Sequence, residues 1–158
     1  MLPMWLVACA PDPAIAVVEI VEGHTTEIVR GARTVAVIGM RDESAKDQPA
    51  FEIPRLLQSL GLAIRPVNPK LTEVLGEKAY ASISEVPEAV DIVDVFRRAD
   101  AIPGIADEIL ALPPERRPRV FWMQTGITND EAAARLTAAG IKVVQDRCLG
   151  VYSRRFRK

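Results

Sequence analysis

Short apolar runs alternate with amphipathic stretches along this sequence from residue 34 onward. Residues 34–38 (TVAVI) are apolar or β-branched and stop at Gly39, as expected of a strand buried on both faces of a parallel sheet. Similar runs predict further strands at 62–67, 89–96, 119–123 and 141–144, with a short strand near 78–81.

Amphipathic spacing predicts three helices between these strands. The first spans 49–60 and has leucines at core spacing, although Pro54 predicts a kink or a later start. The second spans 101–111, where four aliphatic residues form one stripe. In the third, Thr128 and Glu131 predict a capping box at the start, and Gly140 marks the end.

This order of elements predicts the fold class. Parallel strands joined by connections of this length cross over right-handedly, which places helices on both faces of the sheet. We therefore predict an α/β protein with one doubly wound, mostly parallel sheet of five to six strands. The folded domain is expected at residues 27–152, between an N-terminal extension, 1–26, and a solvated basic tail, 153–158.

Composition narrows the class of protein. The chain has 158 residues, is 49% hydrophobic and 26% charged, and carries a formal net charge of -1. This describes one globular domain and excludes a disordered chain. A balance so near zero provides no field for attracting nucleic acid or an anionic membrane, so neither partner is expected. Two distant cysteines, Cys9 and Cys148, fit a reducing compartment and a cytoplasmic location.

The N-terminal residues offer little chemistry. His24 is the only histidine and lies in a polar stretch, so we expect it to be exposed rather than catalytic. No zinc-type spacing occurs, and no metal site is predicted. Residues 1–10 are apolar but fewer than the roughly 18 needed to span a membrane, and no targeting role is expected.

Candidate site residues follow the predicted strands, because ligands bind outside the carboxyl ends of such sheets. Four of the five strand ends carry a cation or a carboxamide and no acid, which favours an anionic, nucleotide-like ligand. These segments are Gly39-Met40-Arg41, Asn68-Pro69-Lys70, Phe96-Arg97-Arg98 and Gln124-Thr125-Gly126. The fifth segment, residues 146–150, carries an acid.

The end of the second strand is the most informative of these segments. A site for NAD usually has Asp or Glu there to bind the ribose hydroxyls, and it follows a G-x-G-x-x-G turn. This chain lacks that turn and has Asn68, Pro69 and Lys70 instead. These residues favour a ribose that carries phosphate, as in NADP or coenzyme A. The alternative is that they form only a strand-ending turn.

Three other residues could carry chemistry. Asp94 lies between two valines and is expected to be hydrogen-bonded for structural reasons, and Trp122 is expected in the core. Cys148 follows the last strand, where it could face the pocket or be an ordinary turn residue. No catalytic residue is predicted.

Six segments in register resemble the stand-alone CoA-binding domain proteins, relatives of the N-terminal domain of the succinyl-CoA synthetase alpha subunit. The resemblance covers about residues 27–152. The segments are 34–39, 46–51, 67–69, 90–98 (VDIVDVFRR), 122–126 (WMQTG) and 146–148.

The resemblance implies a Rossmann-like fold that binds coenzyme A across the strand ends. By analogy, Gly39, Met40, Arg41 and Lys46 would lie in the phosphate-binding loop. Asn68, Pro69 and Lys70 would lie near the adenosine. Val95, Phe96 and Arg97 would line the path of the nucleotide and pantetheine, and Gln124 and Gly126 would close the far side.

The resemblance also implies that the ligase reaction needs more than this domain, namely a phosphohistidine domain and a nucleotide-binding partner subunit. We therefore expect a non-catalytic protein that binds coenzyme A or an acyl-CoA, with no predicted protein partner. One alternative is an oxidoreductase or redox sensor that uses NADP or NAD. Another is an interaction subunit with a vestigial pocket.

Overall fold

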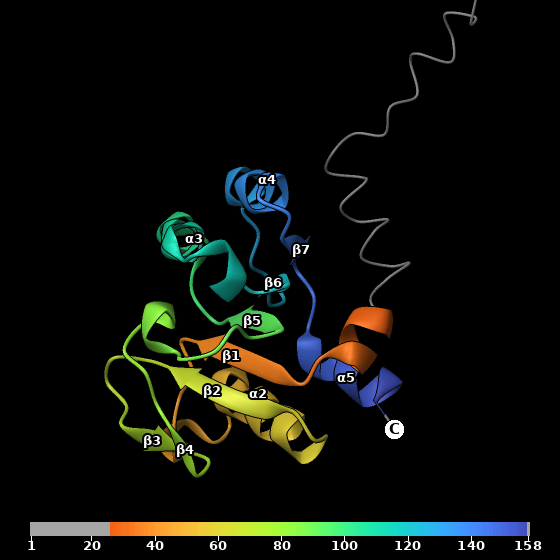
Figure 1. The fold of residues 1–158 in the computed structure, drawn as a ribbon. Coiled ribbons are helices and arrows are strands. Elements are labelled where there is room, and N and C mark those ends of the chain that lie inside the picture. The colour runs from red at the N-terminus through yellow and green to blue at the C-terminus, as the bar shows by residue number, and fades with distance from the viewer. Residues whose placement is uncertain (1–25, 158) are drawn as a thin grey trace, which may run out of the picture.

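A five-stranded parallel sheet forms the centre of the computed structural model, which describes residues 26–157 (Figure 1). The strand order is β2-β1-β5-β6-β7. The bounds are Thr34–Ile38 for β1, Ala63–Val67 for β2, Ile92–Val95 for β5, Val120–Met123 for β6 and Lys142–Val144 for β7. This arrangement confirms the predicted fold class. The extension predicted for residues 1–26, with Cys9 and His24, lies outside the described residues except for residue 26.

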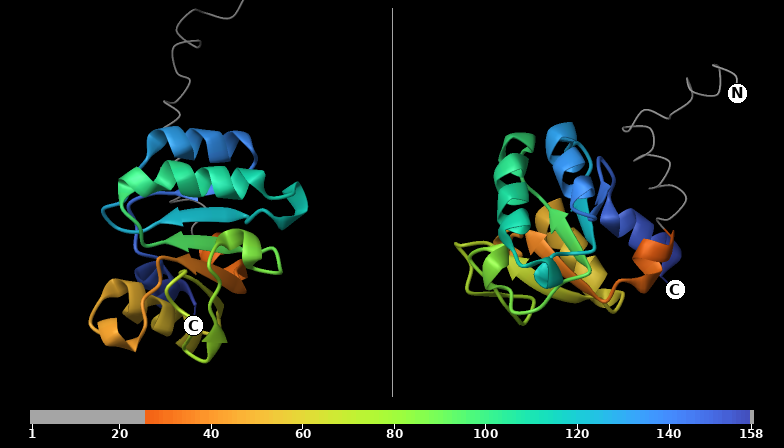
Figure 2. Two further views of the ribbon diagram at one scale, coloured as in Figure 1. Left: turned by 90° about the vertical axis from the view of Figure 1, so that its left-hand side faces the viewer. Right: turned by 45° about the horizontal axis from the view of Figure 1, so that its top comes forward.

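Helices cover both faces of the sheet, so the domain has three layers (Figure 2). On one face lie α3, Ile102–Ala111, and α4, Asp130–Ala138. On the other lie α2, Pro49–Ser59, and α5, Leu149–Phe156, beside a short helix at residues 26–31. Burial on both faces of the sheet explains why the strand sequences are almost continuously apolar.

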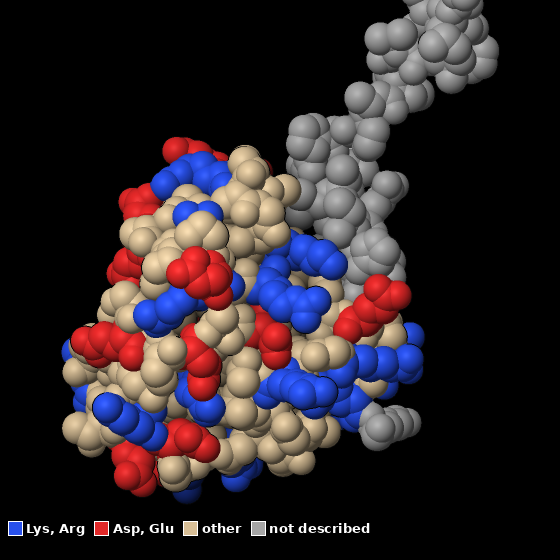
Figure 3. Space-filling view, viewed as in Figure 1, with Lys and Arg blue, Asp and Glu red and all other residues tan. Residues whose placement is uncertain are grey.

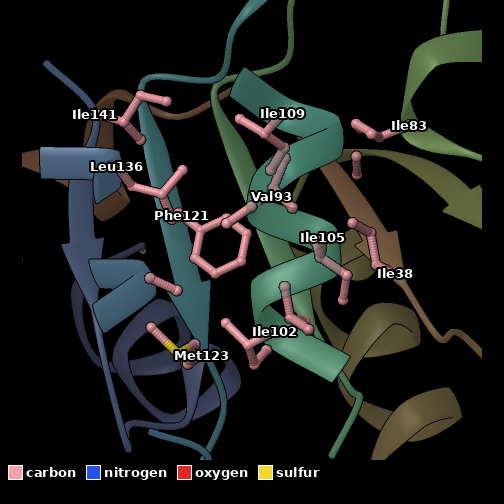
Figure 4. Packing of buried hydrophobic residues seen from close by; sticks show 14 of the residues in the cluster. Ile38, Ile83, Val93, Ile102, Ile105, Ile109, Phe121, Met123, Leu136 and Ile141 are labelled. Atoms are coloured by element: carbon pink, nitrogen blue, oxygen red, sulfur yellow. The ribbon is translucent and has the colours of Figure 1, made fainter. Parts of the chain in front are cut away.

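Each face of the sheet has its own core. Figure 4 shows the core beneath α3 and α4, in which Phe121 and Val93 pack against Ile105, Ile109 and Leu136. The second core, under α2 and α5, contains the fully buried Trp122, as predicted. Burial of this apolar surface is the dominant favourable contribution to folding.

Small elements connect the larger ones. A two-stranded antiparallel hairpin, β3 (Glu73–Val74) and β4 (Glu77–Lys78), follows β2, and Tyr80 makes an isolated bridge to Val67. The short strand predicted at 78–81 lies in this segment. Single-turn 3₁₀ helices complete the path: η2 (Glu43–Ala45), η3 (Ile83–Glu85), η4 (Ala99–Ala101) and η5 (Pro114–Arg116).

The later start considered for α2 and the capping box predicted for α4 are both wrong. Helix α2 begins at Pro49 and continues through Pro54, because Arg41 N–H, at 3.0 Å, donates to Ala50 O, the carbonyl that Pro54 cannot serve. The capping box does not form: Asn129, rather than Thr128, is the N-cap of α4, and its side chain accepts from Ala132 N–H at 2.9 Å.

The basic C-terminal residues form part of a helix, which the sequence analysis did not predict. Helix α5 extends to Phe156, and its arginines face outward while Ser153 is fully buried. Beyond it, Arg157 Nη1 donates to Val29 O and Ala32 O, each at 2.7 Å. The two ends of the described chain are therefore hydrogen-bonded to one another.

Candidate functional site

The strand order locates the place where a ligand can enter. From β1 the chain goes to β2 on one side and later to β5 on the other, so the order reverses between β1 and β5. In doubly wound sheets the crevice outside the carboxyl ends at such a reversal is where ligands bind.

A cleft of about 840 Å³ opens at this edge of the sheet, toward β6. Four predicted site residues line it: Phe96, Arg97, Gln124 and Gly126. Arg98, Thr125 and Cys148, which belong to the candidate strand-end segments, line it as well. The lining residues that the sequence analysis did not assign to the site are Gln48, Pro49, Ala50, Ile53, Ala99 and Ile127.

A backbone donor reaches the cleft from the start of α2. Its N-cap, Gln48, makes no side-chain capping hydrogen bond, and Pro49 occupies the first turn. Gln48 N–H donates to Ala45 O, Phe51 N–H donates to Gln48 O and Pro49 has no N–H, so Ala50 N–H is the donor of this turn that the described residues leave free. This donor and the partial positive charge of the helix end suit a phosphate. The sequence predicted this helix start at residue 49, but not that it lines the site.

Positive charge comes from the end of β5. Arg97 is exposed, lines the cleft and makes no ion pair among the described residues, whereas Arg98 lies 3.7 Å from Asp100. The Arg97 stem also packs over Gly39: a Cβ on Gly39 would lie 2.9 Å from Arg97 Cδ and closer still to Phe96 O. Gly39 thus allows the ends of β1 and β5 to approach closely.

The predicted phosphate loop is only partly available to a ligand. Gly39 N–H donates to Val67 O at 3.0 Å, and Arg41 N–H is taken by Ala50 O. The Met40 side chain is fully buried in the core. The side chains of Arg41 and Lys46 are exposed at the same edge of the sheet, outside the cleft lining.

The residues after β2 combine a structural turn with an exposed cation. Asn68 Nδ2 donates to Met40 O at 2.8 Å, and its Oδ1 accepts from Lys70 N–H at 2.9 Å. This is the strand-ending turn considered above, and it ties β2 to β1. Pro69 and Lys70 are exposed, but neither lines the cleft.

A buried carboxyl lies next to the cleft. Asp94 is fully buried, as is Val95, and Asp94 Oδ1 accepts from Gln124 Nε2 at 2.6 Å. Burial raises the pKa of Asp94 to about 7, against the lowering effects of the hydrogen bonds from Gln124 and from the backbone of Val95. The expected structural hydrogen bond is present, and it joins Asp94 to a residue of the cleft.

The far wall is formed by the segment after β7. Cys148 lines the cleft as a free, half-buried thiol at the N-cap of α5. Gly126, with φ +83°, donates its N–H to Asp146 Oδ1 at 2.6 Å, which joins the segments after β6 and β7.

Other surfaces and cavities of the molecule carry charge of both signs. Both signs of charge are interspersed over the face shown in Figure 3. A second cavity, about 420 Å³, lies at the opposite edge of the sheet beside Asp91, Arg119 and Lys142. In residues 26–157 no cluster of three or more His, Cys, Asp or Glu side chains is arranged for a metal ion. No helix in that range combines the length and apolarity needed to cross a bilayer.

The sheet order and the cleft at its carboxyl edge define a Rossmann-like α/β domain. Comparison with known proteins then identifies the family: residues 33–154 match the CoA binding domain family, and the chain belongs to it. It is 38% identical over 125 residues to the uncharacterized protein YneT of Bacillus subtilis, and the match covers 79% of this chain and 88% of YneT.

Two further relatives are similar to this chain, one a much longer ligase and the other a solved structure of similar length. An ADP-forming acetate–CoA ligase of Archaeoglobus fulgidus is 27% identical over 125 residues, and the match covers 75% of this chain but 18% of the ligase. A solved Thermus thermophilus protein superposes with a TM-score of 0.78 at 38% identity, covering 85% of this chain and 98% of that one.

Proposed function

We propose that the protein binds coenzyme A or an acyl-CoA in the cleft at the carboxyl ends of β5 and β6, and that it does so without catalysing a reaction on it. The observation that carries the proposal is the combination, in one cleft, of Arg97, which makes no ion pair within residues 26–157, with the uncapped N-terminus of α2. Cations and free helix N–H groups both favour phosphate.

The chemistry of the cleft lining supports binding rather than catalysis. The described residues that line it include carboxamides, arginines, a threonine, a cysteine and apolar groups, and none of them is a carboxylate or an imidazole. General acid–base catalysis needs such a group within hydrogen-bonding reach of the reacting atom. The Asp94 carboxyl is separated from the cleft by Gln124.

A comparison of ligands tests the proposal. Thermal unfolding is followed with coenzyme A, dephospho-CoA, NADP, NAD and ATP at equal concentrations, because a ligand that binds only the folded state raises stability by RT ln(1 + [L]/Kd). We expect the largest shift with coenzyme A and a smaller one with dephospho-CoA, which lacks the phosphate on the ribose. A shift with NADP or NAD but none with coenzyme A would contradict the proposal.

Variants at the strand ends test the location. Arg97→Ala is expected to weaken coenzyme A binding about tenfold or more, because a hydrogen bond to a charged group contributes roughly 1.5–3 kcal/mol. Calorimetric titration measures the change. Lys142→Ala removes an equal charge at the opposite edge and is the matched control. Lys70→Ala is expected to weaken binding as well if the phosphorylated ribose extends to the end of β2, and unchanged affinity in both Arg97→Ala and Lys70→Ala would place the ligand elsewhere.

A further inference from the structure

The Asp94–Gln124 pair gives the cleft a directional hydrogen-bonding group. Asp94 pairs with Trp122 in the register of β5 and β6, and Gln124 lies two residues beyond Trp122 on the same face of the sheet. Gln124 is only 4% exposed, yet it lines the cleft. The amide of Gln124 therefore lies between the buried carboxyl and any ligand.

The carboxyl determines which way this amide points. An ionised carboxylate only accepts hydrogen bonds, so it must face Nε2 of Gln124 and not Oε1. Oε1 then remains as the polar atom not used by the protein, since it accepts no hydrogen bond from the described part of the chain. Asp94 Oδ2 likewise has no partner among the described residues.

We infer that Gln124, oriented by Asp94, is a specificity-determining residue whose Oε1 accepts a hydrogen bond from an N–H or S–H donor of the ligand's pantetheine arm. This inference rests on the proposed function. Pantetheine carries two amide N–H groups and, when it is not acylated, a thiol. A protonated Asp94 carries an O–H donor as well as an acceptor, so it also permits the reversed pairing in which it donates to Oε1. In that pairing the amide presents its NH₂ group to the cleft, which is the wrong polarity for these donors.

The inference makes binding of the arm depend on pH. The pKa of Asp94 is raised to about 7 by burial, so the binding-competent, ionised form is about nine-tenths populated near pH 8 and about one-tenth near pH 6. On this face of the sheet, helix α2 carries Glu52, which forms an ion pair with Arg55 at 3.0 Å and is not among the causes of the Asp94 shift. Helix α5 contributes Tyr152 against Trp122, the cleft side contributes Arg97, Arg98 and Cys148, and the shift of Asp94 has none of these as a cause.

The experiment compares coenzyme A with an armless ligand, the methyl ester of 3′-phosphoadenosine 5′-diphosphate, which keeps all three phosphates of coenzyme A and has a methyl group in place of the pantetheine arm. Dissociation constants for both ligands are measured at about pH 6 and about pH 8, and the ratio of the two isolates the contribution of the arm. Titration of the ligand phosphates affects both ligands and cancels in this ratio. For the wild type we expect the advantage of coenzyme A to fall up to about tenfold between pH 8 and pH 6.

Two variants separate this role from a structural one. Asp94→Asn keeps an acceptor opposite Nε2 but cannot ionise, so the ratio is expected to be the same at both pH values. Gln124→Leu removes the acceptor, so coenzyme A loses its advantage at pH 8 while binding of the armless ligand is unchanged. A ratio that is equal in all three proteins and at both pH values would overturn the inference while leaving coenzyme A binding intact. Failure of the wild type to bind either ligand would instead overturn the proposed function.

Discussion

At the scale of single residues, Gly39 shows how one position can serve the fold and the site together. Its φ of +82° is left-handed, and the space for a Cβ is filled by Phe96 O and the Arg97 stem. The sequence predicted this glycine as a point of close phosphate approach. The structure shows that the close approach is to the protein's own β5 end.

Gly39→Ala is therefore expected to destabilise the protein more than an alanine at another left-handed glycine. Gly140 has φ +85° with nothing within 4 Å of a Cβ, so Gly140→Ala has only the backbone cost, about 1–2 kcal/mol. Overpacking against Phe96 adds roughly 1–3 kcal/mol for Gly39→Ala. Urea unfolding measures both, and equal losses would show that the β1 and β5 ends separate freely.

Asp94 affects stability as well as the proposed site. The folded state keeps this proton up to about pH 7, whereas an unfolded Asp loses it near pH 4, so the folded state binds more protons between these values. The free energy of unfolding therefore falls as pH rises from about 4 to about 7. Asp94→Asn should remove this contribution and raise stability near pH 8 by a few kcal/mol. Urea unfolding across the pH range tests this, and equal slopes for both proteins would contradict it.

At the scale of elements, the sequence predicted those whose signals are local. The apolar runs located all five strands of the sheet, and β1 has the predicted bounds. The predictions failed where a distant residue decides the outcome. Arg41 N–H allows Pro54 inside α2, and the pairing of Arg157 with residues 29 and 32 secures the C-terminal helix. Such long-range partners have no periodic signature in the sequence.

Helix α5 is expected to depend on Arg157. Its guanidinium donates to carbonyls at the C-terminal end of the 26–31 helix, where a positive charge is favourable. Arg157→Ala should lower the free energy of unfolding by roughly 1–3 kcal/mol. Arg154→Ala, at an exposed position of the same helix, is the control and should change stability by less than about 0.5 kcal/mol. A similar loss in both variants would assign the effect to net charge.

At the scale of the whole molecule, topology predicted the edge of the sheet but not the full wall of the site. Parallel strands end at one edge, so the sequence could assign residues 96, 97, 124 and 126 to the cleft that they line. It could not show that the start of α2 completes the cleft, because helix packing brings it there, and it left open whether Cys148 faces the cleft. Nor could it show that Met40 points into the core and that Asn68 is engaged by the backbone.

The molecule has cavities at opposite edges of one sheet, and the binding proposal distinguishes them. Coenzyme A should slow amide hydrogen exchange around 48–53, 96–99 and 124–127, because a bound ligand there adds its binding energy to any local opening of those segments. The segments of the other cavity, around 27–32, 114–120 and 139–142, lie at the amino ends of the strands and should be protected only to the extent that global unfolding is suppressed. Exchange measured by mass spectrometry with and without coenzyme A separates the two patterns. Selective protection at the amino ends would mean that the family's fold is used here with its ligand on the opposite edge.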